Sequence, residues 1–253
     1  MIFIFMNNTL NKRVPYHTYE FWPSDTEELF NINSKKYSDS LHIVNYINNP
    51  IKYTLNNVAM RTPDDFTLNG DGNIFLGCSH TFGIGHHLND AWSYKLSQKI
   101  GGKFYNISEP SSGIITQYRW LKYFSNKINF KNVFHYYPTE CLERYEYFLN
   151  NEFQQLAINS DVSASYNYDD FYFNVLTNKN QIKFNTEVYT DAIKNICKEN
   201  GANYYVVNES FIEQPINPYD MTTTPARDLT HYSAETHDEI VNLFYNQYNL
   251  TII

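Results

Sequence analysis

The stretch Asn73-Ile74-Phe75-Leu76-Gly77-Cys78-Ser79 joins a short apolar run to a glycine and then to a serine. An apolar run that ends at a glycine predicts a short buried strand. Runs of similar character follow at Lys103–Ile107, Asn132–Tyr137 and Asn203–Val207. Segments with helical spacing precede these runs, at Asn89–Ile100, Ile114–Ile128 and Thr186–Glu199. Strands that alternate with helices predict a parallel sheet covered on both faces.

The rest of the chain fits around this α/β pattern. Ser233 is a candidate N-cap for a last helix that runs to about Tyr248, and Cys141–Phe153 is compatible with another helix. We therefore expect a three-layer α/β/α sandwich with a mostly parallel sheet in residues 66–253. Residues 157–184, rich in Ser, Asn, Asp and Tyr, predict an insertion or cap. Residues 1–65 read as an irregular extension that wraps the core, with a strand at Ile51–Leu55.

Charge and cysteine content narrow the class of protein. The net charge of −8, with no basic stripe, argues against a nucleic-acid partner. Three widely spaced cysteines favour a reducing compartment over a disulfide framework. The apolar start Met1–Met6 is too short to span a bilayer and lacks the marks of a signal peptide, so it predicts a strand, an interface segment or a tail. These features predict a cytoplasmic protein without a membrane span.

A nucleophile, a base and a carboxylate occur in the chain order Ser79, Asp228, His231. Ser79 directly follows a predicted strand, and catalytic groups of parallel sheets lie at the carboxyl ends of strands. A serine hydroxyl becomes a good nucleophile when a histidine takes its proton and a carboxylate orients that histidine. Asp228 and His231 are three residues apart, so that one turn places both side chains on the same side. The order and spacing are compatible with a catalytic triad.

Three short blocks resemble the SGNH/GDSL hydrolase family, in particular its bacterial and phage members. The first is Gly77-Cys78-Ser79, followed by Thr81, Gly83 and Gly85, and the last is Asp228-Leu229-Thr230-His231. Between them, the run from Asn106 to Gly113 is similar to the second block, in which a glycine follows a strand that ends in Asn. The likeness covers about residues 50–240, with a lead-in at Tyr53–Arg61. It implies a flavodoxin-like sheet order.

The resemblance also implies roles for these residues. Ser79 would be the nucleophile, His231 the base and Asp228 its orienting carboxylate. The backbone N–H groups of Ser79 and Gly113 would stabilise the oxyanion, and no cofactor is implied. The chain departs from the family at Cys78, where an aspartate is usual. It also lacks the third block, Gly-x-Asn-Asp, so that the third oxyanion donor is missing or supplied by another group, for which Thr139 is a candidate.

Other interpretations of the same residues stay open at this point. Ser79 can simply cap the helix after the strand, and Asp228 can pair with Arg227. The cluster of Cys78, His80, His86 and His87 has residue types that bind zinc, but its spacing matches no metal motif, and we expect no metal. Aromatic side chains such as Trp92 and Trp120 are expected to build the core.

The function expected from these features is a serine ester hydrolase. By the resemblance it would act on short acyl esters or on acetylated carbohydrate, with transfer of the acyl group to a sugar hydroxyl as a variant. The rival is a non-catalytic or weakly catalytic interaction or structural protein of a phage particle on the same fold. A homo-oligomer or a virion component is the protein partner that these hypotheses leave open.

Overall fold

The computed structural model describes residues 13–67, 71–149, 152–157, 178–208 and 223–250 of the 253-residue chain. Its centre is a sheet of four strands: β3 (Gly72–Gly77), β4 (Lys103–Asn106), β5 (Phe130–Tyr137) and β8 (Asn203–Asn208). The strand order is β4-β3-β5-β8, and every neighbouring pair is parallel. The chain is therefore an α/β protein, as the alternation of strands and helices predicts.

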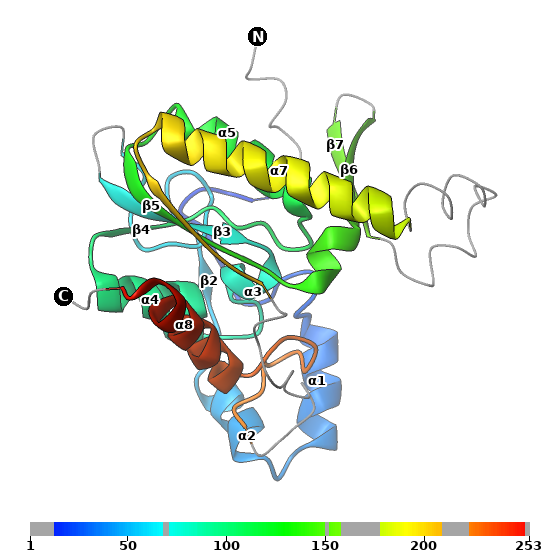
Figure 1. Cartoon of the computed structure of the whole chain (residues 1–253). Helices are drawn as coiled ribbons and strands as arrows, with labels where there is room; N and C mark the ends of the chain where they lie inside the picture. The colour runs from blue at the N-terminus through cyan, green and yellow to red at the C-terminus, as the bar shows by residue number, and fades with distance from the viewer. Residues whose placement is uncertain (1–12, 68–70, 150–151, 158–177, 209–222, 251–253) are drawn as a thin grey trace.

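Two pairs of helices flank this sheet (Figure 1). On one face lie α5 (Ile114–Ser125) and α7 (Lys179–Glu199), and on the other lie α4 (Trp92–Ile100) and α8 (Ala234–Tyr248). Each face has its own apolar cluster, one around Trp120 and Leu121 and the other around Trp92 and Phe244. The arrangement is compatible with a three-layer α/β/α fold.

The strand order creates a topological switch point in the sheet. The chain leaves β3 through α4 toward one edge, and leaves β5 through α7 toward the opposite edge. The carboxyl ends of β3 and β5 therefore flank a topological switch point, where ligands of open α/β sheets bind. Helix α3 (Ser79–Phe82) begins directly after β3 at this point.

Most predicted elements of the sheet region are present with shifted ends. The four strands match the predicted runs within two residues, and Ser233 caps α8 by accepting a hydrogen bond from the Thr236 N–H. The helix predicted from Asn89 begins at Trp92, after a 3₁₀ turn η3 (Leu88–Asp90). Helix α7 begins at Lys179, seven residues earlier than predicted, because Asn178 caps it through the N–H groups of Asn180 and Gln181.

The predicted strand at Ile51–Leu55 is present as a short strand, but the prediction that the rest of the first 65 residues is irregular was wrong for the described part. This region holds β1 (Thr18–Tyr19), α1 (Glu27–Lys36), α2 (Leu41–Asn48) and β2 (Tyr53–Thr54), and β1 pairs antiparallel with β2. Both ends of helix α1 are stabilised. Thr26 is its N-cap and accepts a hydrogen bond from the Leu29 N–H. Glutamates in the first turn and lysines in the last turn complement the helix dipole. Side chains of this region contact the rest of the chain, as in the buried ion pair of Arg13 with Glu109.

The helix predicted at Cys141–Phe153 was also wrong. A 3₁₀ turn η4 (Thr139–Glu143) leads into an antiparallel hairpin of β6 (Arg144–Leu149) and β7 (Glu152–Ala157). The sequence Tyr145–Leu149 is rich in aromatic residues that favour strands. The connecting residues, Asn150 and Asn151, are of a type that favours turns.

Two predictions concern residues that the structure does not describe. Met1–Met6 and residues 158–177, most of the predicted insertion, lie outside the described residues. None of the helices in the described ranges is long and apolar enough to cross a bilayer.

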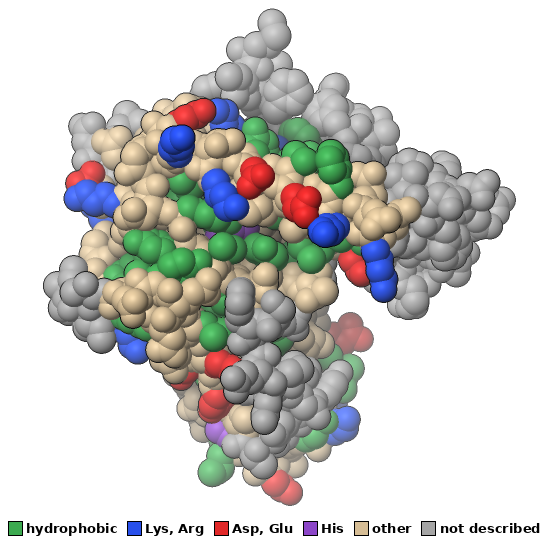
Figure 2. Space-filling view, in the orientation of Figure 1, with side chains coloured by type: hydrophobic (Ala, Val, Ile, Leu, Met, Phe, Trp, Pro, Cys, Tyr) green, Lys and Arg blue, Asp and Glu red, His purple; other side chains and the backbone are tan. Residues whose placement is uncertain are grey.

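In the view of Figure 2, charges of both signs alternate over α7, where Lys183 lies near Glu187 and Lys194 near Asp191.

Candidate active site

Ser79 lies on a tight turn at the carboxyl end of β3. The turn needs a glycine at position 77, because a Cβ there would lie 2.1 Å from Thr81 Oγ1 and 2.5 Å from the Tyr136 carbonyl oxygen. Ser79 opens α3 and is 6% exposed. Its Oγ lies 4.0 Å from Cys78 Sγ, which is a weak contact. The predicted nucleophile therefore sits at the switch point.

Asp228 and His231 form a close pair on the loop before α8. His231 Nδ1 lies 2.6 Å from Asp228 Oδ2, and Asp228 Oδ1 accepts from the backbone N–H groups of Thr230 and His231. A carboxylate next to Nδ1 places the ring proton there, so that Nε2 of neutral His231 carries the lone pair. This tautomer is the one that a general base for a serine hydroxyl needs.

The pair shifts the pKa values of both members in opposite directions. Burial opposes the charged form of each, but their mutual hydrogen bond and attraction outweigh it. The pKa of Asp228 falls to about 2, and that of His231 rises above its ordinary value of 6.5. Asp228 is therefore ionised at neutral pH and stabilises an imidazolium at position 231.

The loop that carries this pair packs against the residues that follow Ser79. The Gly85 carbonyl accepts from the Arg227 N–H at 2.8 Å. Gly85 has φ +75°, and a Cβ there would lie 2.8 Å from Ala226 Cβ and 3.1 Å from Asp228 Oδ1. The ring of His231 lies 5.1 Å from that of His80, the residue after Ser79. Ser79 and the Asp228–His231 pair are therefore on the same edge of the sheet.

Within the described residues, Ser79 Oγ and His231 form no direct hydrogen bond. Hydrogen bonds between a nucleophile and its base are often long in structures without substrate. The structure thus brings the two segments together without a direct hydrogen bond between the predicted nucleophile and base.

The second predicted block lies beside the turn of Ser79. Gly77 O, at the end of β3, accepts from the Glu109 N–H at 3.2 Å and from Ser112 Oγ at 3.1 Å. Gly113 follows Ser112 and begins α5, and the Arg144 carbonyl oxygen would lie 2.1 Å from a Cβ at position 113. Glycine is therefore required there by the close approach of the β6 backbone.

Thr139, the substitute predicted for the third block, lies at the start of η4 and is exposed. It lines a surface hollow with residues of α7, among them Lys179 and Ile182. The side chain thus borders α7, and its contribution to an oxyanion site stays a prediction.

Comparison with known proteins gives no relative: neither a protein-family model nor a curated protein matches the chain. The resemblance to SGNH/GDSL hydrolases consequently depends on the quoted blocks and on the geometry of the site.

The histidines of the predicted cluster each make different contacts in the structure. His80 stacks on Tyr232 at 3.9 Å, while His86 Nε2 lies 2.6 Å from the Tyr232 carbonyl oxygen. His87 Nε2 lies 3.4 Å from the Asn49 side-chain amide. His237, which the sequence did not single out, accepts from the Trp92 N–H and packs edge-on to His86. In the described part of the chain, no three His, Cys, Asp or Glu side chains group as metal ligands do.

Buried neutral histidines predict that the protein loses stability in mild acid. Burial lowers the pKa of His86 to about 4 and that of His135 to about 3, from 6.5. The unfolded chain therefore binds protons at these sites below pH 6.5 while the folded chain does not. Each site should cost about 2 kcal/mol of unfolding free energy between pH 6.5 and 4.5.

Urea unfolding at the two pH values checks this prediction. His86→Gln should reduce the difference in unfolding free energy between pH 6.5 and 4.5 by about 2 kcal/mol. The same pH dependence in wild type and variant would show that His86 is not a neutral buried group.

A buried ion pair joins the N-terminal region to the candidate triad. Arg227, which precedes Asp228, donates to Asp25 through Nε at 3.0 Å and through a terminal nitrogen at 2.6 Å. Both side chains are 1% exposed. Tyr53 also donates to Asp25 and accepts from the Gly85 N–H at 2.9 Å. Arg227 therefore pairs with Asp25, and the predicted alternative of an Asp228–Arg227 pair was wrong.

Loss of this pair should be strongly destabilising. Asp25→Asn leaves the guanidinium of Arg227 buried without its counter-charge, which typically costs about 3–5 kcal/mol. The exposed pair of Asp71 with Lys131 offers a matched control, and Asp71→Asn should cost less than about 1 kcal/mol. Denaturant unfolding of both variants measures the two costs. Equal, small costs would contradict the structural role of Asp25.

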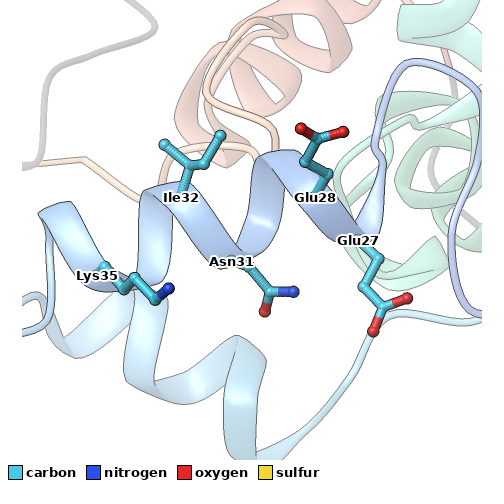
Figure 3. Close-up of a pocket in the computed structure, with 5 residues that line it drawn as sticks. All are labelled: Glu27, Glu28, Asn31, Ile32 and Lys35. Carbon is cyan, nitrogen blue, oxygen red and sulfur yellow. The ribbon is translucent and has the colours of Figure 1, made fainter.

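A separate hollow lies along α1 (Figure 3). It is lined by Glu27, Glu28, Asn31, Ile32 and Lys35, all from this helix. None of the predicted site residues lines it. The chemistry predicted from the sequence is thus at the sheet edge and not in this hollow.

Proposed function

We propose that the protein is a serine ester hydrolase of the SGNH/GDSL type. Ser79 Oγ attacks the ester carbonyl carbon while His231 Nε2 takes the hydroxyl proton. The proton then passes to the leaving alcohol as the C–O bond breaks, leaving an acyl group on Ser79. Water activated by His231 attacks the acyl group, releasing the carboxylic acid and restoring Ser79.

The observation that carries this proposal is the Asp228–His231 pair packed against the segment that Ser79 opens. The 2.6 Å contact holds the base in the required tautomer, and the raised pKa of His231 suits a group that must accept a proton near neutral pH. A carboxylate and a histidine without a nearby nucleophile would support only a structural pair. Here the His80 ring, one residue from the nucleophile, contacts the His231 ring.

Two backbone N–H groups support stabilisation of an oxyanion. In the region that the structure describes, neither the Ser79 nor the Gly113 N–H has a protein acceptor. The Gly77 carbonyl connects the two segments through its bonds to Glu109 N–H and Ser112 Oγ. Unpaired donors held close to a nucleophile are the groups that stabilise the negative charge of a tetrahedral intermediate.

Hydrolysis of a panel of p-nitrophenyl esters with acyl chains of two to eight carbons tests the proposal. By the resemblance to the family, we expect turnover that is fastest for the shortest acyl groups. Activity should be the same with and without a chelator, since no metal takes part. Purified, folded protein that hydrolyses none of these esters, nor an acetylated polysaccharide, would contradict the proposal.

Thr139→Ala tests whether the absent third block is replaced at this position. Thr139 is exposed and borders α7. We therefore expect kcat to fall by much less than the ~10²–10³ that loss of an essential oxyanion donor causes. Steady-state kinetics on p-nitrophenyl acetate measure the effect. A fall of 10² or more would assign the third donor to Thr139.

The second candidate is an interaction protein on the same fold, such as a structural part of a phage particle. One observation favours it: Leu41, Ile47 and Ile32 on α1 and α2 are 82%, 54% and 54% exposed. Exposed apolar side chains of this size are more frequent on interaction surfaces than elsewhere. Inactivity on the ester panel would favour this candidate.

A further inference from the structure

A line of polar side chains crosses the otherwise apolar layer between the sheet and α5. His135 of β5 is fully buried, and its Nε2 lies 2.6 Å from Gln117 Oε1. Its Nδ1 lies 2.7 Å from the Tyr204 hydroxyl of β8. The Gln117 side-chain amide donates to Ser112 Oγ at 3.3 Å. Ser112 Oγ in turn donates to the Gly77 carbonyl at 3.1 Å.

The hydrogen bonds in this line have one consistent direction. Gln117 Oε1 can only accept, so His135 Nε2 carries the ring proton and Nδ1 has the lone pair. Nδ1 then accepts from the Tyr204 hydroxyl, which stays protonated because burial raises its pKa well above 10.0. Burial also keeps His135 neutral, as its low pKa of about 3 requires. Each side chain along the line therefore donates to the next one, from Tyr204 to the Gly77 carbonyl.

The line ends between the two segments that hold the candidate oxyanion donors. Ser112 precedes Gly113, and Gly77 lies two residues before Ser79. A polar line inside an apolar layer costs free energy that well-packed apolar side chains would not cost. A fully satisfied line, however, fixes the relative position of the groups that it joins.

We propose that Gln117, supported by His135 and Tyr204, is a positioning residue that holds the Ser112–Gly113 peptide against the turn of Ser79. This inference rests on the proposed function and deepens it. The line fixes the Ser112–Gly113 segment relative to Gly77. The segment that carries Asp228 and His231 is held by other contacts, those of Arg227 with Asp25 and with the Gly85 carbonyl, so that base and oxyanion donors are placed independently.

Paired substitutions test this role in the full-length protein. Gln117→Met keeps the length of the side chain and removes both hydrogen bonds, and Tyr204→Phe removes only the far end of the line. Tyr105→Phe is the matched control, because the buried Tyr105 hydroxyl of the same layer has no hydrogen-bond partner among the residues that the structure describes. The readouts are kcat and KM on p-nitrophenyl acetate, and amide hydrogen exchange of peptides that cover residues 77–79 and 109–113.

For Gln117→Met we expect kcat to fall about 10–100-fold with KM unchanged, as a misplaced donor would cause. We expect faster exchange at residues 109–113 as well. Tyr204→Phe should show a smaller change of the same kind, and Tyr105→Phe none. Unchanged exchange in Gln117→Met would overturn the inference, as would faster exchange without a fall in kcat. An inactive wild type would contradict the proposed function alone, and the exchange data would then decide whether the line holds the loop.

Discussion

Ser79→Ala should abolish formation of an acyl-enzyme and lower kcat by about 10⁶, the effect of removing a triad nucleophile in another serine hydrolase. The reason is that the Ser79 hydroxyl supplies the atom that forms the covalent bond, and no neighbouring group replaces it. The change removes one oxygen whose single hydrogen-bond contact within the described ranges is the weak 4.0 Å contact with Cys78 Sγ. The unfolding free energy should therefore change little.

Burst kinetics on p-nitrophenyl acetate and denaturant unfolding check both parts of this prediction. Cys78→Ala is the matched control, since it changes the adjacent buried residue and leaves Ser79 in place. We expect Cys78→Ala to keep the burst. A Ser79→Ala protein that retains the burst, with Cys78→Ala losing it, would assign the nucleophile to Cys78.

Asp228→Asn should lower kcat by about 10⁴, because an amide at this position no longer enforces the tautomer of His231. The pH profile should move as well. Active His231 is neutral, so activity is lost as pH falls through its pKa, which lies above 6.5 in the folded protein. Removal of the Asp228 carboxylate leaves burial as the main influence on the ring and lowers that pKa. The acid limb of the profile should shift to lower pH.

Measurement of kcat/KM from pH 5 to 9 in both proteins separates the two effects. A loss of rate without movement of the acid limb would show that Asp228 does not interact with the titrating group. An acid limb that moves to higher pH would contradict the pairing of Asp228 with His231.

The strands of the central sheet and the last helix were predictable from local signals. Apolar runs that end at Gly77 or Pro138 mark the strand ends, and Ser233 is an N-cap of the usual type. The pairing of Asp228 with His231 was predictable for the same reason, since they are three positions apart in the sequence and one turn joins them.

The two N-terminal helices and the β6–β7 hairpin were missed although signals were present. Thr26 with two following glutamates, and two lysines at 35 and 36, mark the ends of α1. Aromatic residues on either side of Asn150-Asn151 are typical of a hairpin. Pro23 and Pro50 divide the first region into short segments, which favoured an irregular interpretation over the helices between them.

Contacts between distant segments had no signal in the sequence. Asp25 and Arg227 are 202 residues apart, and His135 meets Gln117 only because β5 packs under α5. Such pairs form only in the completed fold. The sequence around either partner alone indicates no more than an ordinary surface charge or core residue. The Asp228–His231 pair was therefore predictable, while the contacts that hold it in place were not.

Labelling with a fluorophosphonate probe tests the central claim most directly, because the probe reacts with an activated serine whatever the natural ester is. Peptide mass spectrometry then locates the adduct. We predict stoichiometric labelling of Ser79 in wild type, slow labelling in Asp228→Asn and none in Ser79→Ala. Folded wild-type protein that carries no adduct at Ser79 would contradict the assignment of this chain as a serine hydrolase.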